Sequence, residues 1–373
     1  MPKSEEELLM SIARPAMRVL VAALLCLALG HASARILPKK RDLQEDFPDV
    51  GLTPPQMIER QGYPAETHWV TTSDGYILQM HRIPNPGRPV ILVQHGSLSS
   101  SADWLLMGEG KCIPYMLWDR GYDVWLGNAR GNTWSRNHTW MNPDTNLDFW
   151  DFTFHEMGVY DLPAVIDYML AQTGVQKIDY IGHSMGTSMF YVLCSELPEY
   201  NARIRQMHSY APVAFMELTR SPLLLYIAPW VWVWDWISLM MGQGEYMPSD
   251  DLNNAVADAT CSDESYLQDA YHASTDSRQF EQYDYGGSLN LPHYGQMFPP
   301  NYQVEKITAP VYFHYADNDL LAHPWDVEKL EKKVANSRGL YKPNLLLFSH
   351  IDFIWGIDAQ SLVYDLTFQQ LGV

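Results

Sequence analysis

Ser184 lies at the centre of a pentapeptide that is typical of nucleophilic catalysis. The segment Gly182–Gly186 reads GHSMG and matches the pattern G-x-S-x-G. It follows a short apolar run, Lys177–Ile181, and precedes a helical run, Thr187–Leu193. Between a strand and a helix, small residues permit a strained turn that lifts the serine hydroxyl above the sheet, and the N-terminus of the helix favours developing negative charge. This context favours a nucleophile over an ordinary tight turn.

A serine hydroxyl needs a histidine that accepts its proton and an acid that orients the histidine. In folds that carry the serine on such a turn between a strand and a helix, the chain order is serine, acid, histidine. We expect the last strand at Leu345–Phe348, and His350 follows it almost directly. Because His350 is the only histidine after His323, it is the predicted base.

The predicted acid lies in a turn that offers two carboxylates. The apolar run Pro310–Tyr315, which we expect to be a strand, leads into Asp317 and Asp319. Either carboxylate could instead cap the helix that is predicted to begin near Pro324. Position along the chain leaves the choice between them open.

An ester hydrolase also needs two backbone N–H groups that bind the oxyanion of the tetrahedral intermediate. We expect one from Met185, directly after the nucleophile. The other is predicted to come from Ser97, in the loop His95-Gly96-Ser97 that follows the strand expected at Pro89–Gln94. A plain turn is the alternative interpretation of that loop.

Apolar runs of strand length recur along the chain, with helical stretches between them. Thr67–Thr72 and Tyr76–Ile83 are predicted to form a hairpin, and Asp161–Gln172 has the apolar spacing of a helix. Buried strands that alternate with helices predict an α/β fold, with a mostly parallel sheet covered on both faces. The strands expected in that sheet are Pro89–Gln94, Tyr122–Leu126, Lys177–Ile181, Ser209–Ala214, Pro310–Tyr315 and Leu345–Phe348.

The composition excludes several classes of protein. The 373 residues are 47% hydrophobic and 18% charged, which is typical of a globular protein. A formal net charge of −19 argues against a binder of nucleic acid or other polyanions. His293, His314 and His323 are scattered without the spacing of metal ligands, and no dinucleotide fingerprint occurs. We therefore expect neither a metal nor a cofactor.

The N-terminal residues 1–34 have the features of a secretory signal peptide. Val19–Leu29 is wholly apolar but too short to span a membrane comfortably, and the small residues Ala32–Ala34 suit cleavage near Ala34. Acidic residues before this run are unusual in a signal peptide, so we expect translation to start at Met17. In a secreted chain the sequon at Asn137 is predicted to carry a glycan.

Three cysteines follow the predicted cleavage site. Cys112 and Cys194 are expected to be buried thiols, because neither lies in a reactive motif. Cys261 has no obvious partner. The chain is therefore not a disulfide scaffold.

At this point the chain resembles the acid lipase family, which comprises gastric and lysosomal acid lipases and their insect relatives. The resemblance implies an α/β-hydrolase core with a helical cap that acts on neutral lipid esters. It also implies that Asp319, in the motif N-D-x-L-A, is the catalytic acid, and it supports His350 as the base. The matching segments run nearly end to end and include GYP at 62–64, TSDGY at 72–76, GYDVWLGN at 121–128, RGNT at 130–133, YDLP at 160–163, GHS at 182–184, NDLLA at 318–322 and HIDFIW at 350–355.

Three features depart from the family pattern. Met185 stands where the family usually has glutamine, and Ser97 stands where it usually has an apolar residue, but in both cases the expected donor is the backbone. In the cap, Cys261 is followed after a short segment by QYDYG at 282–286, so several tens of residues, including a cysteine pair, are missing relative to the family. The resemblance therefore implies a shortened cap.

The expected cap is an insertion over residues 219–300, between core segments at 35–218 and 301–373. Within it, Leu223–Met241 is nearly all apolar, although Pro229 and Asp235 argue against a membrane span. Interfacial lipid contact is the favoured interpretation, and a buried core segment is the main alternative. The residues predicted to contact lipid are Trp230, Trp232, Trp234 and Trp236.

Together these features predict a secreted or lysosomal serine lipase that cleaves triacylglycerol or steryl esters through an acyl-enzyme. It is expected to act as a monomer that touches a membrane or lipid droplet transiently. The alternative is a lipid-binding member of the same fold whose catalysis is impaired by the shortened cap. An ordered set of Ser184, Asp319 and His350 favours the enzyme.

Overall fold

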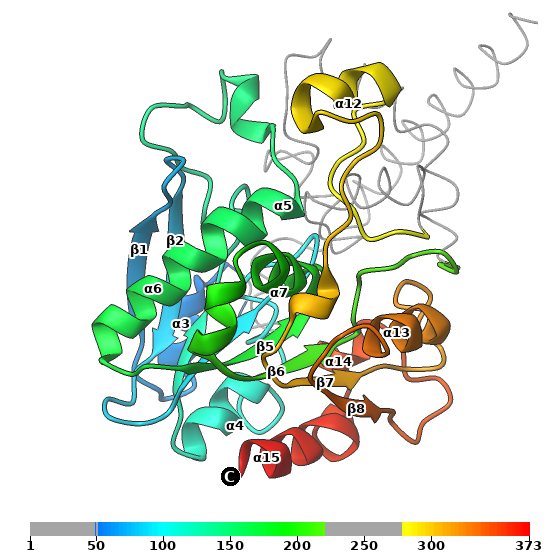
Figure 1. Ribbon diagram of the computed structural model, residues 1–373. Helices are drawn as coiled ribbons and strands as arrows, with labels where there is room; N and C mark the ends of the chain where they lie inside the picture. The colour runs from blue at the N-terminus through cyan, green and yellow to red at the C-terminus, as the bar shows by residue number, and fades with distance from the viewer. Residues whose placement is uncertain (1–48, 50, 221–277) are drawn as a thin grey trace, which may run out of the picture.

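A central β-sheet organises the part of the chain that the computed structural model describes, which is residue 49 and residues 51–220 and 278–373. Its order is β1-β2-β4-β3-β5-β6-β7-β8 (Figure 1). The hairpin strands β1 and β2 are antiparallel to each other and β2 is antiparallel to β4, whereas the remaining neighbours are parallel. The strands are β1 (Glu66–Thr71), β2 (Ile77–Ile83), β3 (Val90–Gln94), β4 (Asp123–Leu126), β5 (Ile178–His183), β6 (Ile204–Tyr210), β7 (Val311–His314) and β8 (Ser337–Tyr341).

Helices cover both faces of this sheet. In Figure 1, α6 and α7 lie above it and α4 and α15 lie below it, where the Arg120 guanidinium at the end of α4 stacks 3.9 Å from the Phe368 ring of α15. The α-helices are α3 (Pro54–Arg60), α4 (Ile113–Asp119), α5 (Phe154–Glu156), α6 (Leu162–Thr173), α7 (Met185–Glu196), α12 (Gly287–Tyr294), α13 (Pro324–Glu331), α14 (Asp352–Trp355) and α15 (Asp365–Leu371). Short 3₁₀ and π segments are η1 (Leu147–Trp150), η2 (Met157–Asp161), η3 (Pro198–Arg203), η5 (Val304–Lys306) and η6 (Gln360–Tyr364).

The central strands are apolar because both of their faces are covered. Every residue of β3, β4 and β5 is buried, which is the pattern of strands between two helical layers. The edge strands β1 and β8 are only partly buried. The predicted α/β fold, its hairpin and the helices at 161–172, 187–193 and near Pro324 are confirmed.

Two predicted strands are wrong in position. The strand expected at Ser209–Ala214 runs instead over β6, because its first residues mix buried Ile204 and Met207 with polar side chains. The strand expected at Leu345–Phe348 is a turn with three exposed leucines. The last strand is β8, whose sequence SRGLY carries little apolar signal because it lies at the sheet edge.

Several predictions fall wholly or partly outside the described residues. These are the signal peptide, Cys261, Leu223–Met241 with Trp230, Trp232, Trp234 and Trp236, and most of the cap. Of the range 278–300, α12 lies beyond α5, at the top of the view in Figure 1. Cys112 and Cys194 are buried free thiols, as predicted. The described helices include none that is long and apolar enough to cross a membrane.

Candidate active site

Ser184 occupies a sharp turn between β5 and α7. Its φ of +51° and ψ of −122° place a non-glycine residue in a conformation that L-amino acids rarely adopt. The backbone N–H of Ser184 donates to the carbonyl of Tyr210 on β6 at 3.0 Å, which ties the turn to the neighbouring strand. The strained geometry places the side chain at the N-terminus of α7, as the sequence pattern predicted.

The glycines of the pentapeptide are required by close packing. A Cβ on Gly182 would lie 2.7 Å from the carbonyl oxygen of Gly186. A Cβ on Gly186 would lie 2.6 Å from the carbonyl oxygen of His95 and 2.7 Å from that of Gln94. Real Cβ atoms do not approach backbone oxygens so closely, so any other residue at either position would force the backbone of the turn to shift.

The structure brings His350 to Asp319. Nδ1 of His350 lies 2.8 Å and 3.0 Å from the two carboxylate oxygens. The same carboxylate accepts hydrogen bonds from the amides of Leu321 at 2.8 Å and Ala322 at 2.9 Å. Burial raises the pKa of Asp319, but the charge and hydrogen bond of His350, together with these two amides, outweigh it and hold the pKa below its ordinary value. Asp319 therefore stays a carboxylate that can orient the imidazole.

Two other titratable side chains near this site, Asp317 and His323, have different partners. Asp317 is exposed and forms an ion pair with Lys342, with Nζ 2.8 Å from the carboxylate. His323 is the residue before α13, and its Nδ1 accepts a long hydrogen bond of 3.4 Å from the amide of Trp325. Of the two carboxylates between which chain position left the choice open, Asp319 is the one that contacts His350 among the described residues.

His350 is also joined to the serine turn. Nε2 of His183, the residue before Ser184, lies 2.9 Å from the main-chain carbonyl oxygen of His350. The two imidazole rings are 4.9 Å apart between centroids. The chain therefore places the predicted base beside the turn that carries the predicted nucleophile.

The loop predicted to supply an oxyanion donor lies against the same serine. A Cβ on Gly96 would lie 2.9 Å from Cβ of Ser184, so Ser97 follows a residue in direct contact with the nucleophile. Met185 is the first residue of α7, and the amides of the first helical turn have no acceptor within the helix. Met185 thus directly follows Ser184 in the chain, and Ser97 directly follows the glycine that packs against it.

Sequence reasoning missed the support of this loop. Nδ1 of His95 donates to the carbonyl of Gly96 at 2.7 Å, and Nε2 accepts from the amide of Ala129 at 3.0 Å and from Nδ2 of Asn132 at 3.1 Å. Burial lowers the pKa of His95 to about 4, which keeps the ring neutral, as these bonds require. The signal lay in the segment at 127–133, which sequence analysis used only for its family resemblance.

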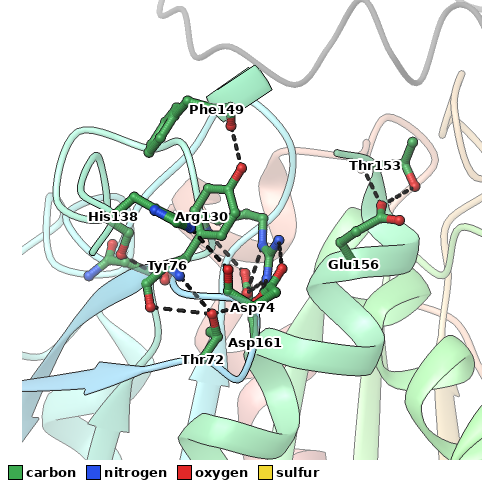
Figure 2. Close-up of polar contacts among 11 residues, drawn as sticks. Thr72, Asp74, Tyr76, Arg130, His138, Phe149, Thr153, Glu156 and Asp161 are labelled. Carbon is green, nitrogen blue, oxygen red and sulfur yellow. Dashed lines mark hydrogen bonds and ion pairs between the residues drawn. The ribbon is translucent and has the colours of Figure 1, made fainter. Parts of the chain in front are cut away.

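The same segment ties the hairpin to α6 through Arg130 (Figure 2). The guanidinium contacts Asp74, at 2.6 Å, and Asp161, at 2.7 Å, and it stacks 4.0 Å from the ring of Tyr76. Asp74 lies in the hairpin turn, and Asp161 is the residue before α6. This buried ion-pair network holds the antiparallel edge of the sheet to the helical layer beside the candidate site.

The loop that carries His350 exposes an apolar surface. Leu346 and Leu347 are 78% and 73% exposed, and Leu345 and Ile351 are about half exposed. Nδ2 of Asn318 donates to the carbonyl of Leu347 at 3.2 Å, which joins this loop to the one that carries Asp319. Asn137, the predicted glycosylation residue, is exposed on a different loop.

The arrangement is suited to acyl transfer through a serine nucleophile. A strained serine, a neighbouring histidine paired with a buried carboxylate, and two loops of backbone amides meet at one edge of the sheet. Among the described residues no group of three or more histidine, cysteine or acidic side chains is placed to hold a metal ion.

Two family models match the chain. One, described as a partial alpha/beta-hydrolase lipase region, matches residues 54–108, and the other, described as the alpha/beta hydrolase fold, matches residues 89–352. An esterase from Pyrococcus furiosus has a similar fold, with a TM-score of 0.51 at 14% identity over 86% of this chain and 94% of its own.

Similarity to curated proteins extends over most of the chain. It is 39% identical over 362 positions to Lipase 3 of Drosophila melanogaster, covering 85% of this chain and 92% of the relative. It is 35% identical over 367 positions to gastric triacylglycerol lipase of Rattus norvegicus, covering 85% and 91%. Since 85% of 373 residues is about 317, about 45 of the 362 positions aligned with Lipase 3 have no counterpart in this chain.

Proposed function

The chain belongs to the acid lipase family of the α/β-hydrolase fold, and on that premise we propose that it hydrolyses neutral lipid esters with Ser184, His350 and Asp319 as its catalytic residues. Membership makes the chain a lipase, an enzyme that cleaves carboxylic esters. The observation that carries the proposed mechanism is the contact between His350 and the buried Asp319, at 2.8 Å, beside the strained turn of Ser184.

In the first half-reaction, Oγ of Ser184 attacks the ester carbonyl carbon while Nε2 of His350 takes the hydroxyl proton. Asp319 accepts a hydrogen bond from Nδ1–H of His350, which holds the tautomer that leaves Nε2 free to act and stabilises the imidazolium. The amides of Met185 and Ser97 bind the oxyanion, an interaction worth about 3–4 kcal/mol for one donor in other hydrolases. The intermediate collapses when His350 protonates the departing alcohol.

In the second half-reaction, water replaces the alcohol. Nε2 of His350 takes a proton from water, which attacks the acyl carbon of the Ser184 ester and forms a second oxyanion at the same amides. Return of the proton to Oγ of Ser184 releases the fatty acid. Each half-reaction therefore begins and ends with a neutral His350 and a carboxylate at Asp319.

Two observations support a lipid ester as the substrate. One of the similar proteins is named a triacylglycerol lipase, and the loop that carries His350 exposes leucines that suit contact with a lipid surface. Triacylglycerol and steryl ester both fit this chemistry. We further propose that the enzyme enters the secretory pathway, acts outside the cell or in the lysosome, carries a glycan at Asn137 and works as a monomer.

The test compares the full chain with Ser184→Ala, after expression in a secreting host. Hydrolysis of emulsified triacylglycerol, emulsified steryl ester and a short soluble ester is measured at pH 5 and pH 7. Ser195→Ala is the matched control. Ser195 is a buried serine of α7, the helix that follows Ser184, and its hydroxyl donates to the carbonyl of Tyr191. We expect activity in the wild type and in Ser195→Ala, and its loss in Ser184→Ala.

Other outcomes would change the proposal in defined ways. Activity on the soluble ester alone would place a defect in the lipid contacts of the shortened cap. A folded wild type that cleaves no ester would overturn the proposal and support the non-catalytic lipid binder, an alternative that the names of the similar proteins do not favour. Failure of the chain to enter the secretory pathway would contradict that part of the proposal only.

A further inference from the structure

His183 is a buried histidine that the mechanism above does not use. It is the last residue of β5, and its Nε2 lies 2.9 Å from the carbonyl oxygen of His350. A carbonyl oxygen only accepts, so Nε2 carries the proton and Nδ1 does not. Nδ1 is buried without a hydrogen-bond partner among the described residues.

The ring of His183 is neutral and confined. Burial first, and the charge of His350 second, lower the pKa of His183 to about 3. Trp104 meets the ring edge-on, with centroids 6.4 Å apart. On another side, a Cβ on Gly96 would lie 3.1 Å from Nδ1. The ring of His183 is therefore held in one tautomer and one orientation, in which its Nε2–H donates to the carbonyl of His350.

The backbone around His350 has little regular support of its own. β8 ends at Tyr341 and α14 begins at Asp352, so His350 lies in the irregular segment between them. The side chain of Asp352 caps this segment by accepting from the amide of Ser349 at 2.7 Å. Elsewhere in the segment Asn318 donates to the carbonyl of Leu347 and Phe348 is buried, while His350 itself is held by Asp319 through its ring and by His183 through its carbonyl.

These two contacts determine different quantities. The bond to Asp319 fixes the direction of the imidazole, whereas the bond to His183 fixes the distance between the backbone of the base and the residue next to the nucleophile. Proton transfer from a serine hydroxyl depends steeply on that distance, and displacement by about 1 Å lowers rates about 100-fold in other enzymes.

We propose that His183 is a positioning residue, which as a neutral Nε2–H donor holds the main chain of His350 at the distance from Ser184 that proton transfer requires. This inference rests on the proposed function. It differs from a packing role for His183, in which only the volume of the ring matters.

The test exploits the reach of two amide side chains. In His183→Gln the amide nitrogen can take the place of Nε2, whereas in His183→Asn it takes the place of Nδ1 and falls short of His350. We expect His183→Asn to lower kcat on a soluble ester by about 10- to 100-fold with little change in KM. We expect His183→Gln to keep kcat within about threefold of the wild type.

Two controls separate positioning from stability. Titration of active sites with a fluorophosphonate gives kcat per competent site rather than per molecule of protein. His138→Asn is the matched control, because Nε2 of the buried His138 bonds to the carbonyl of Asp74 at 3.0 Å in a different loop. We expect that variant to lose stability but to keep kcat within about twofold.

Equal kcat values for His183→Asn and His183→Gln, or a change confined to KM, would overturn the positioning role in an enzyme that still depends on Ser184. A wild type whose activity survives Ser184→Ala would instead overturn the proposed function, and this inference with it. His183→Asn and His183→Gln both keep a polar side chain of moderate size. If both variants unfold, the ring acts through its volume, which would overturn the positioning role.

Discussion

The turn that carries Ser184 and the loop that carries His350 are built in opposite ways. The turn lies between β5, whose residues are all buried, and α7. A Cβ on Gly182 or Gly186 would approach backbone atoms to less than 3 Å. The loop lies between an edge strand and a short helix, and it exposes three consecutive leucines. Packing therefore positions Ser184, the proposed nucleophile, whereas a few directed hydrogen bonds position His350, the proposed base.

This difference predicts how each region fails. A defect in the turn must disturb backbone packing, so stability and activity fall together. A defect in one of the loop's directed hydrogen bonds leaves the buried side chain of Phe348 in place, so we expect activity to fall while the fold survives. The predictions below test this contrast.

The largest expected effect comes from the partner of the loop, Asp319, which holds the ring of His350 from a neighbouring loop. Asp319→Asn removes the carboxylate that orients His350, and we expect kcat on a soluble ester to fall about 10⁴-fold, as in other enzymes with this set of residues. Asp317→Asn is the control, since Asp317 pairs only with Lys342 at the surface, and it should change kcat less than twofold. Equal losses in the two variants would mean that Asp319 is not the acid.

The second effect is in the turn. Gly186→Ala places a methyl group within 2.7 Å of the carbonyl oxygens of His95 and Gln94, so we expect the free energy of unfolding to fall by about 2–3 kcal/mol and kcat by about 100-fold. Gly174→Ala is the control, because its Cβ would meet no atom within 4 Å despite a φ of +73°. Gly174→Ala should cost about 1 kcal/mol and leave kcat unchanged. Loss of activity in Gly186→Ala without loss of stability would contradict positioning by packing.

The smallest expected effect, counted for each residue, is the change in the free energy of unfolding with pH. Burial lowers the pKa of His81 and His95 to about 4 and of His183 and His314 to about 3. Unfolded histidine titrates near 6.5, so below that pH the unfolded chain binds protons that the folded chain does not. The contribution of these buried histidines to stability is therefore fully present above pH 6.5 and is lost as the pH falls through 4 towards 3.

Urea unfolding at pH 7 and pH 5 measures this linkage. We expect the free energy of unfolding to be lower at pH 5 by about 2 kcal/mol or more. Asp103 and Asp161, whose pKa values burial raises, act in the opposite direction. Stability that is equal or greater at pH 5 would show that these histidines become charged in the folded protein.

Sequence analysis predicted the turn better than the loop for a physical reason. Gly182, Ser184 and Gly186 are adjacent in the chain, and the steric demands of the turn leave a local pattern. The loop carries no such pattern, because Leu345–Phe348 resembles a buried strand, although its three leucines lie exposed and only Phe348 is buried. The real last strand, β8, lies at the sheet edge, where half-buried polar residues suffice.

The supports of the site were harder to predict than its principal residues. His95 bonds to residues about 35 positions away, and Arg130 bonds to Asp74 and Asp161, which are 56 and 31 positions away. A buried polar network leaves no periodicity in the sequence, because its members form hydrogen bonds with residues that are far away along the chain. The segment at 127–133 drew attention only through its resemblance to the family.

The sequence by itself determined the sheet type, the strained serine turn, the order of serine, acid and histidine, and the family. Each of these follows from local apolar patterns or from small residues required at fixed spacing. Only the tertiary structure brought Asp319 rather than Asp317 into contact with His350, placed the last strand at β8 and joined His183 to the carbonyl of His350. Those outcomes depend on contacts between segments far apart in the chain, and hydrogen-bond distances between such segments exist only once the sheet has folded.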